Sequence, residues 1–429
     1  MKKVLANPFL FFLPFLIMYA IMILVLRKNV LEGDEGRYLL YANNLVQGFY
    51  SPKGQVYLWN GPGYPILLMP FVALHFSLLS LTLFNAVFQY LSVVLIYKTL
   101  LIYISKRKAL FFSIFWACYY IAFKEMGLIY TESFTILLIS AFQYFFIRAF
   151  KVENPRKYCI AAGLLLGYII LTKVIFAYVV LALMFTTIIL LFSSPKKHTR
   201  KIIFILVLAI GSNLPYLFYT YQLSGKFFYW ANSGGSSLYW ASSPFAGEFG
   251  DWNNEEFTTY CNIDSLIPCN SAIIAKNHEA DFTKFRQYDW VQKDMAFKAK
   301  AIENIKAHPA KYLKNYVCNA GRMVFGVPQS FFYQRFENLL RIPPNAIVFT
   351  FLLFSSIITL LYRHRIKYEI RFLALFLVIY LAGSAALSAE QRQFYIVIPM
   401  ILLWTAFIFN EFVTLHTRSI GRIDTKSGT

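Results

Sequence analysis

The chain has 429 residues, of which 58% are apolar and only 14% are charged, and its formal net charge is +20. A soluble protein of this length carries roughly 25% charged residues, so the composition excludes an ordinary soluble domain. The basic residues lie in short segments between long apolar runs and not in a patch interleaved with aromatic residues, which argues against nucleic-acid binding.

Continuous apolar runs dominate the sequence. Runs of roughly 18 to 22 apolar residues are long enough to cross a bilayer as helices, and they exclude a β-barrel, whose strands would alternate. We therefore predict an all-α polytopic membrane protein. The expected spans are residues 8–26, 82–103, 109–123, 129–149, 158–171, 174–193, 201–221, 343–362, 369–387 and 393–413. The first is expected to be retained, because no small-residue cleavage site follows it.

The apolar segment 64–80 decides the topology, because it has three prolines at or near it. Four basic loops should be cytoplasmic by the positive-inside rule. They are residues 105–108, 151–157, 196–201 and 363–367. All four are cytoplasmic only if segment 64–80 dips into the membrane or lies along it, or if a further short crossing accompanies a full one. We therefore expect an odd number of crossings between residues 62 and 104, with both termini in the cytoplasm.

This topology divides the chain into four parts. Residues 1–221 form an N-terminal transmembrane region with an outer loop at 27–61, and residues 222–342 form an extracytoplasmic segment. Residues 343–413 form a C-terminal transmembrane region, and residues 414–429 a cytoplasmic tail. The charges at the outer ends of the spans then share one face, and charged groups near membrane depth are usually functional. They are Asp34, Glu35, Lys124, Glu125, Glu132, Lys173, Glu390 and Arg392.

The acidic pair Asp34-Glu35 follows the first apolar run directly. Such a pair at the end of a span is often only a solvated loop. A positioned carboxylate is also what glycosyl transfer to a hydroxyl group requires, because it accepts the proton of the acceptor. We predict that Asp34 is this base. Glu35, the second predicted catalytic residue, would orient the acceptor or pair with Arg37.

Several motifs resemble the GT-C superfamily of glycosyltransferases, and within it the protein-mannosyltransferase and aminoarabinose-transferase-like group. They occur in the family's order over most of the membrane region. They are the run from Asp34 to Tyr38 with Ala42, the run from Gly61 to Pro65, Tyr130-Thr131-Glu132, the segment from Gly163 to Lys173, and Arg392 with Tyr395 and Pro399. The resemblance implies a GT-C-type transmembrane helical bundle with an extracytoplasmic domain or cap.

The same resemblance implies a polyprenyl-phosphate sugar as the donor. Lys173, Arg392 and Lys124 are expected to bind the donor phosphate, although a lysine such as Lys173 often only reaches for the membrane surface. The expected substrate-binding residues are Arg37, Tyr38, Glu132, Tyr64 and Trp59. One departure is that Trp59-Asn60-Gly61 lacks the lysine that the aminoarabinose transferases place there, so Lys53, Lys124, Lys173 or Arg392 would have to replace it.

No cofactor is predicted with certainty. The sequence shows no nucleotide-binding glycine motif and no paired-histidine metal motif. The resemblance leaves room for a divalent metal ion at Asp34 or Glu35. In the outer segment, Trp230, Tyr239, Trp240 and Trp252 are candidates for stacking on sugars or for anchoring at the membrane surface. An oxidising exterior would permit a disulfide between Cys261 and Cys269, and reduced thiols are an equal alternative.

The sequence thus predicts an inverting glycosyltransferase in a bacterial inner membrane, with its active site facing the periplasm. Its partners would be the lipid bilayer, a polyprenyl-phosphate sugar and a glycan or glycolipid acceptor such as lipopolysaccharide or O-antigen. One alternative is a protein O-mannosyltransferase of the same fold. Another is a transporter or flippase of lipid-linked sugars, for which charges in mid-span would be expected.

Overall fold

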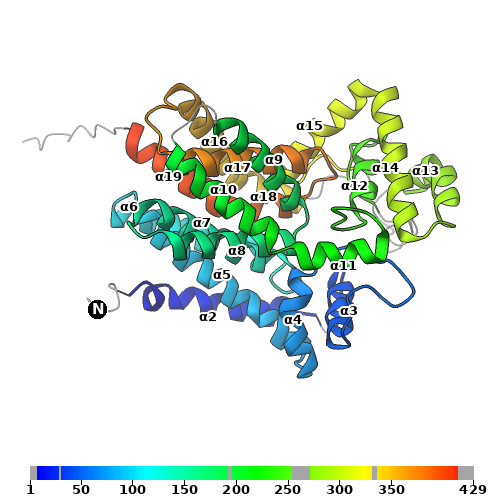
Figure 1. The fold of residues 1–429 in the computed structure, drawn as a ribbon, viewed down its shortest axis with the longest axis horizontal. Helices are drawn as coiled ribbons and strands as arrows, with labels where there is room; N and C mark the ends of the chain where they lie inside the picture. The colour runs from blue at the N-terminus through cyan, green and yellow to red at the C-terminus, as the bar shows by residue number, and fades with distance from the viewer. Residues whose placement is uncertain (1–6, 29, 192–195, 254–270, 331–335, 414–429) are drawn as a thin grey trace, which may run out of the picture.

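The computed structural model describes residues 7–28, 30–191, 196–253, 271–330 and 336–413. These residues form helices and no strand, and most of the long helices run in roughly the same direction (Figure 1). In chain order the helices of the first half are α2 (Pro8–Leu26), α3 (Glu35–Val46), α4 (Gly63–Ala73), α5 (Leu78–Leu100), α6 (Lys106–Ala117), η1 (Tyr120–Phe123), α7 (Glu132–Lys151), α8 (Arg156–Thr172) and α9 (Ile175–Leu191).

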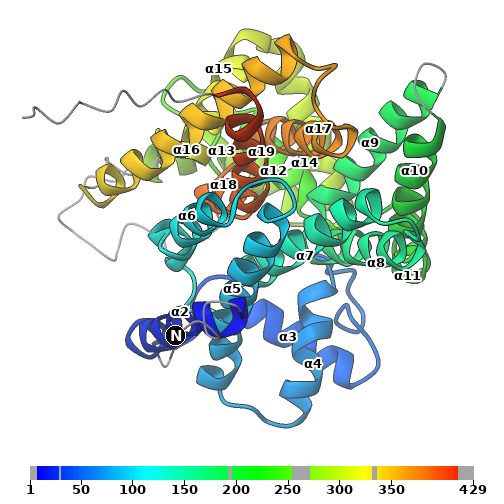
Figure 2. The ribbon, with the colours of Figure 1, turned by 90° about the vertical axis from the view of Figure 1, so that its left-hand side faces the viewer.

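The second half continues the bundle and adds helices at one end of it. Its helices are α10 (Lys196–Gly211), α11 (Leu214–Ser224), α12 (Gly234–Ala241), α13 (Ser271–Phe285), α14 (Trp290–Ala307), α15 (Pro309–Phe325), α16 (Phe336–Leu361), α17 (Tyr368–Ala385), α18 (Gln391–Tyr395) and α19 (Ile398–Phe412). Helices α12 to α14 lie beyond one end of the long helices (Figure 1), and α15 packs against α16, α17 and α18. Figure 2 looks along the long helices from the opposite end.

Five helices of the described residues are long and apolar enough to cross a membrane, or six if the bent pair α10 and α11 forms one span. The expected span 201–221 corresponds to this bent pair and not to one straight helix. The axis bends by 42° between the two helices. Pro215 stands in the first turn of α11, and the Asn213 side chain donates to the backbone oxygens of Ala209 and Gly167 at 2.7 and 3.1 Å. These side-chain bonds and the proline interrupt the helical ladder.

Segment 64–80 contains the short helix α4, of 11 residues, before α5 begins at Leu78. Its length is about half of what a membrane crossing requires. The expected span 109–123 is likewise divided, because α6 ends at Ala117 and the 3-10 helix η1 follows. At the C-terminal end, α18 and α19 replace a single span, with Pro399 in the first turn of α19.

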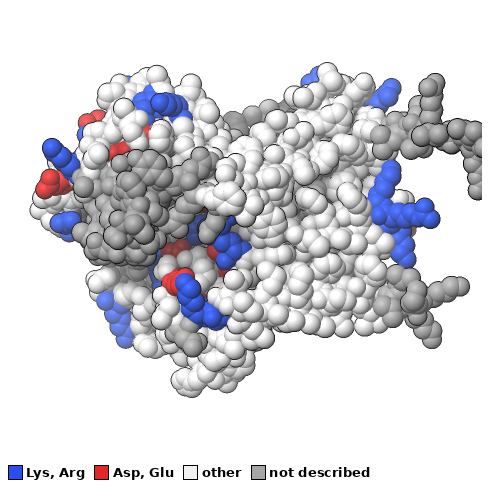
Figure 3. All heavy atoms as spheres, turned by 180° about the vertical axis from the view of Figure 1, so that it is seen from behind, with Lys and Arg blue, Asp and Glu red and all other residues white. Residues whose placement is uncertain are grey.

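The basic loops meet at one end of the bundle. Lys151 Nζ lies 2.6 Å from Glu369 Oε1, to which the Tyr103 hydroxyl also donates at 2.8 Å. Lys108 Nζ donates to Asn410 Oδ1 at 2.9 Å in the same region. Figure 3 shows charged side chains at both ends of the molecule and a broad uncharged band between them. This band is what a bilayer-spanning surface requires.

Helices α12 to α14 enclose a small aromatic core of their own. Its buried members are Tyr239, Trp240, Ile274, Phe282, Phe285, Phe297 and Ala301. The buried His278 links this core to the loop after α12, because its Nε2 lies 2.8 Å from Glu248 Oε2 and its Nδ1 lies 2.6 Å from the Tyr239 hydroxyl. Both ring nitrogens of this buried imidazole thus have a partner within the segment.

Two glycines hold the segment before α4 against the end of α8. A Cβ atom at Gly61 would collide with the backbone oxygen of Leu171, and one at Gly63 would lie 2.7 Å from the Thr172 nitrogen.

We predict that Gly61→Ala lowers the free energy of unfolding by about 1–3 kcal/mol, because the rigid backbone of α8 has to move. Thermal unfolding in detergent measures this. Gly383→Ala is the control, since no heavy atom lies within 4 Å of a Cβ there, and equal stability of the two variants would contradict the prediction.

Candidate functional site

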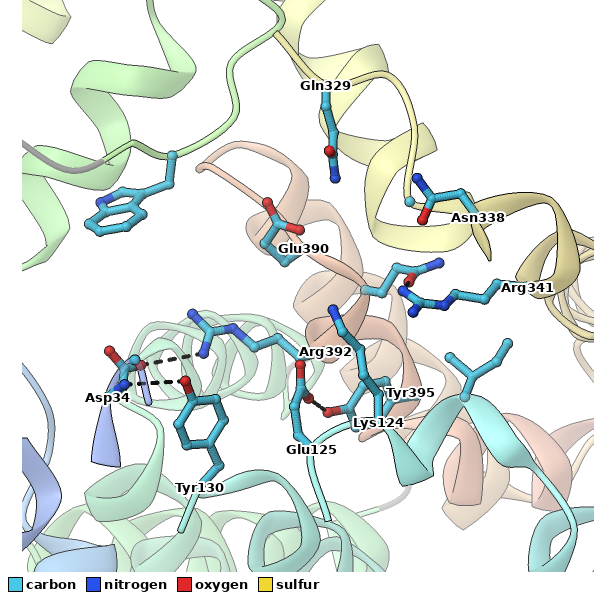
Figure 4. A pocket seen from close by; sticks show the side chains of 15 residues that line it. Asp34, Lys124, Glu125, Tyr130, Gln329, Asn338, Arg341, Glu390, Arg392 and Tyr395 are labelled. Atoms are coloured by element: carbon cyan, nitrogen blue, oxygen red, sulfur yellow. Dashed lines mark hydrogen bonds and ion pairs between the residues drawn. The ribbon is translucent and has the colours of Figure 1, made fainter. Parts of the chain in front are cut away.

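Asp34 lies at the outer end of the bundle, immediately before α3. Its backbone nitrogen donates to the Tyr130 hydroxyl at 3.2 Å, which fixes the turn that presents it. Its carboxylate lies between two guanidinium groups: Oδ1 pairs with Arg37, and Oδ2 lies 3.4 Å from Arg392 Nη1. Figure 4 shows Asp34, Tyr130 and Arg392 converging on one space. The side chain of Asp34 keeps 24% exposure, so a substrate can reach it.

A chain of alternating charges runs away from Asp34. Arg392 Nη1 lies 3.9 Å from Glu132 Oε1, and the same oxygen accepts a hydrogen bond from Lys173 Nζ at 2.9 Å. With Arg37 the chain holds three cations and two acids, a net charge of +1 (3 − 2). Burial opposes the charge of Arg392, but Glu132 and Asp34 outweigh it and raise the pKa of this guanidinium. The chain therefore carries a permanent positive charge next to the candidate base.

Two cavities meet at Asp34 and Arg392, the two residues that line both. The larger has a volume of about 560 Å³ and the smaller about 240 Å³. The larger is lined by Gly33, Asp34, Ile121, Lys124, Glu125, Tyr130, Trp252, Gly326, Gln329, Asn338, Arg341, Glu390, Gln391, Arg392 and Tyr395. Figure 3 shows a hollow with charged side chains at this end of the molecule.

The smaller cavity collects several of the predicted substrate residues. Tyr38, Trp59 and Lys173 line it, together with the start of α9 and the first residues of α12. Tyr64 does not line either cavity. It is buried behind Tyr38, with a ring-centroid distance of 5.3 Å, and so supports that ring from below.

Of the remaining predicted residues, some line a cavity and others do not. Arg37 supports the Asp34 carboxylate and lies 5.4 Å above the Trp59 ring. Lys124 lines the larger cavity and Lys173 the smaller one, so the structure does not bring these two predicted phosphate-binding residues together. Lys53 is exposed and lines neither cavity.

Glu35 has a different environment from its neighbour. Its side chain is fully buried and paired with Arg27, which is 3% exposed. Its oxygens also accept from the backbone nitrogens of Ile129 and Glu32, both at 2.7 Å. The expected pairing of Glu35 with Arg37 is wrong, because these residues point in different directions from the start of α3. Glu35 lines neither cavity and ties the first outer loop to α2 and to the turn before α7.

Glu125 forms the floor of the larger cavity, where its carboxylate accepts from the Tyr395 hydroxyl. Burial, reinforced by the nearby Glu132, raises its pKa to about 7.

The raised pKa of Glu125 means that the folded state binds this proton more tightly than the unfolded state does. The contribution of Glu125 to stability should therefore fall as pH rises from about 4.5 to about 7. We predict that Glu125→Gln flattens this part of the pH profile, measured by thermal unfolding between pH 4.5 and 8; an unchanged slope would contradict it.

Some residues of the site were not predicted. Arg341, at the start of α16, and Gln391 line the larger cavity, where Arg341 Nη1 donates to Gln391 Oε1 at 3.1 Å. A charge at the outer end of the expected span 343–362 was the signal for Arg341. Of the four aromatic candidates of the outer segment, only Trp252 reaches a cavity. Trp230, Tyr239 and Trp240 are buried in the protein core and are not available for stacking on a sugar.

The charges around Asp34 argue against the divalent metal ion that the resemblance allows at Asp34 or Glu35. Both of its carboxylate oxygens face guanidinium groups, and the Glu35 carboxylate is engaged by Arg27. Adding a divalent cation there would place it against two fixed positive charges, so the residues present do not fit such an ion. Within the described ranges, no three His, Cys, Asp or Glu side chains group closely enough to hold a metal. Cys261 and Cys269 lie outside the described residues.

Comparison with known proteins identifies the fold. Residues 60–219 match the model of a family described as dolichyl-phosphate-mannose-protein mannosyltransferase. The archaeal oligosaccharyltransferase AglB from Archaeoglobus fulgidus, solved with an inhibitory peptide and a dolichol-phosphate, is 14% identical over 93% of this chain, with a TM-score of 0.50. The alignment covers 50% of the AglB chain, so this chain spans about half its length.

A second solved structure is ArnT from Cupriavidus metallidurans bound to undecaprenyl phosphate. It is 13% identical, over 93% of this chain and 77% of the ArnT chain, with a TM-score of 0.41. No curated protein sequence matches the chain. The AglB similarity and the all-helical bundle confirm the predicted fold class.

Proposed function

We propose that this chain is a glycosyltransferase of the GT-C superfamily that moves a sugar from a polyprenyl phosphate to an acceptor hydroxyl outside the cytoplasm. The observation that carries the proposal is the contact between Asp34 and Arg392 where two cavities meet. It places a candidate base and a candidate phosphate ligand side by side. The family description and the dolichol-phosphate in the AglB structure support a lipid-linked donor.

The proposed reaction is a direct displacement at the anomeric carbon. Asp34 accepts the proton of the acceptor hydroxyl, and the oxygen attacks the anomeric carbon from the side opposite the phosphate. The bond from that carbon to the phosphate oxygen breaks, and its electron pair leaves with the phosphate. Arg392 and Lys173 stabilise the charge that develops there. A single displacement inverts the anomeric configuration, whereas retention would need a carboxylate nucleophile and a covalent intermediate.

The donor fits the smaller cavity. Lys173 and Arg392 line it, and its wall continues along Val174 and Ile175 at the start of α9, an apolar helix of the bundle. A phosphate at the two cations would therefore lie beside an apolar surface that can receive the isoprenoid chain. The Trp59 ring, which also lines this cavity, offers a face for the sugar.

The proposed acceptor is an envelope glycan such as lipopolysaccharide or O-antigen, and the proposed location is a bacterial inner membrane with the site facing the periplasm. A protein acceptor is the second candidate, because the matching family is described by a protein mannosyltransferase. Protease digestion of the labelled product separates the two, since a glycan product survives the digestion and a glycoprotein product does not.

The test uses the full chain in nanodiscs with a radiolabelled polyprenyl-phosphate sugar and an envelope extract as the acceptor source. We expect the label to enter a polar product while free polyprenyl phosphate is released in equal amount. A nucleotide sugar supplied instead should give no product. Transfer from the nucleotide sugar, or no release of polyprenyl phosphate with any envelope fraction, would contradict the proposal.

A further inference from the structure

The larger cavity is lined by residues that have no role in the proposed reaction. It shares only Asp34 and Arg392 with the smaller cavity, and its volume is more than twice as large. In a direct displacement the acceptor and the leaving phosphate lie on opposite sides of the anomeric carbon. If the donor phosphate lies beside Lys173 in the smaller cavity, the acceptor approaches Asp34 from the larger one.

Two cations of the larger cavity belong to elements far apart in the sequence. Lys124 follows η1, and Arg341 lies in the second turn of α16. Figure 4 shows both side chains reaching into the same space. Neither forms an ion pair with a carboxylate whose side chain the structure describes. Arg341 donates only to the neutral Gln391 at 3.1 Å, and Lys124 is exposed.

The acids of this cavity are already engaged or weakened. The Glu125 carboxylate accepts from Tyr395, and Glu390 caps α18 and lies 3.9 Å from the buried Arg322. Burial raises the pKa of Glu390, and it raises the pKa of Glu125 to about 7, so Glu125 carries less than a full negative charge near neutral pH. The cavity therefore presents two available cations and little free negative charge.

We propose that the larger cavity is the acceptor site and that it takes a glycan bearing an anionic group, a phosphate or a carboxylate, held by Lys124 and Arg341. This inference rests on the proposed function. Hydrogen bonds from charged donors to such a group are among the stronger polar contacts in proteins, and a guanidinium binds it with two parallel bonds. Trp252, which is 37% exposed, lines the same cavity and offers a face to a sugar ring.

The test measures binding of small saccharides to the full chain in phosphatidylcholine nanodiscs that are saturated with farnesyl phosphate, which fills the donor phosphate site. The probes are N-acetylglucosamine 6-phosphate, glucuronic acid and the neutral N-acetylglucosamine, followed by saturation-transfer NMR. We expect at least one anionic probe to bind about tenfold or more tightly than the neutral sugar, and Lys124→Ala or Arg341→Ala to remove most of that preference. The probe that binds identifies the anionic group.

Lys226→Ala and Arg286→Ala are matched controls, because both residues are exposed and line neither cavity. They should keep the preference. Equal binding of all three probes, no binding of either anionic probe, or an unchanged preference in the Lys124→Ala/Arg341→Ala double variant would overturn the inference. A wild type that binds an anionic probe but does not bind farnesyl phosphate would count against the proposed function and not against this inference.

Discussion

Replacing Asp34 by Asn is expected to lower the turnover number of sugar transfer by about 10²- to 10⁴-fold, the range that a positioned general base contributes. The amide has nearly the same shape as the carboxylate but cannot take the proton of the acceptor. It also leaves Arg37 and Arg392 without their shared counter-charge. The effect should therefore appear in turnover, while binding of the polyprenyl phosphate is retained or becomes tighter.

The measurement is transfer from a labelled polyprenyl-phosphate sugar in nanodiscs, together with thermal unfolding to show that the variant is folded. Glu32→Gln is the matched control. It removes an acid two residues earlier, whose side chain is 39% exposed and paired only with the exposed Lys28. The control should transfer sugar at the wild-type rate. A folded Asp34→Asn variant with wild-type turnover would show that Asp34 is not the base.

The sequence was a good guide wherever hydrophobicity alone decided the structure. The first apolar run was expected over residues 8–26, and α2 spans Pro8–Leu26. It was a poor guide where side chains compete with the helical ladder, as at Asn213 and Pro215 between α10 and α11. Hydropathy does not register that competition, because the residues on both sides of the bend are apolar.

The site shows the same division. The rule that charges at membrane depth are functional selected Asp34, Glu132, Lys173 and Arg392, and the structure joins all four in one chain of contacts. The rule does not say, however, which charged residues pair with each other. Asp34 and Arg37 are three residues apart at the start of α3, so they lie on one side and pair.

Glu35, one position after Asp34, points to another side of α3 and meets Arg27, which directly follows α2. Only the packing of α2 against the turn before α7 could reveal that partner. Arg341 was missed for a related reason. The charge just before the expected span 343–362 was a signal that Arg341 lies at the outer end, but its place in one cavity with Lys124 depends on how the helices pack, which no local pattern encodes.

Replacing Glu35 by Ala is expected to lower the free energy of unfolding by about 3–5 kcal/mol, the usual result of removing one partner of a buried ion pair. Arg27 would remain charged and 97% buried, and the backbone nitrogens of Ile129 and Glu32 would lose their acceptor. Denaturant unfolding in detergent measures this. Replacing both partners, as Arg27→Leu/Glu35→Leu, should cost less than the single change, because no unpaired charge remains.

The neighbouring pair Lys28–Glu32 provides the control for this experiment. Its side chains are 70% and 39% exposed at a distance of 2.7 Å, so Glu32→Ala should cost no more than about 1 kcal/mol. A further variant, Glu35→Gln, distinguishes the two possible roles of Glu35. If it takes part in the chemistry, Glu35→Gln will lose turnover while unfolding as the wild type does. If Glu35 holds the outer loop in place, stability and turnover will fall together. The fraction of molecules that remains folded will still bind the polyprenyl phosphate.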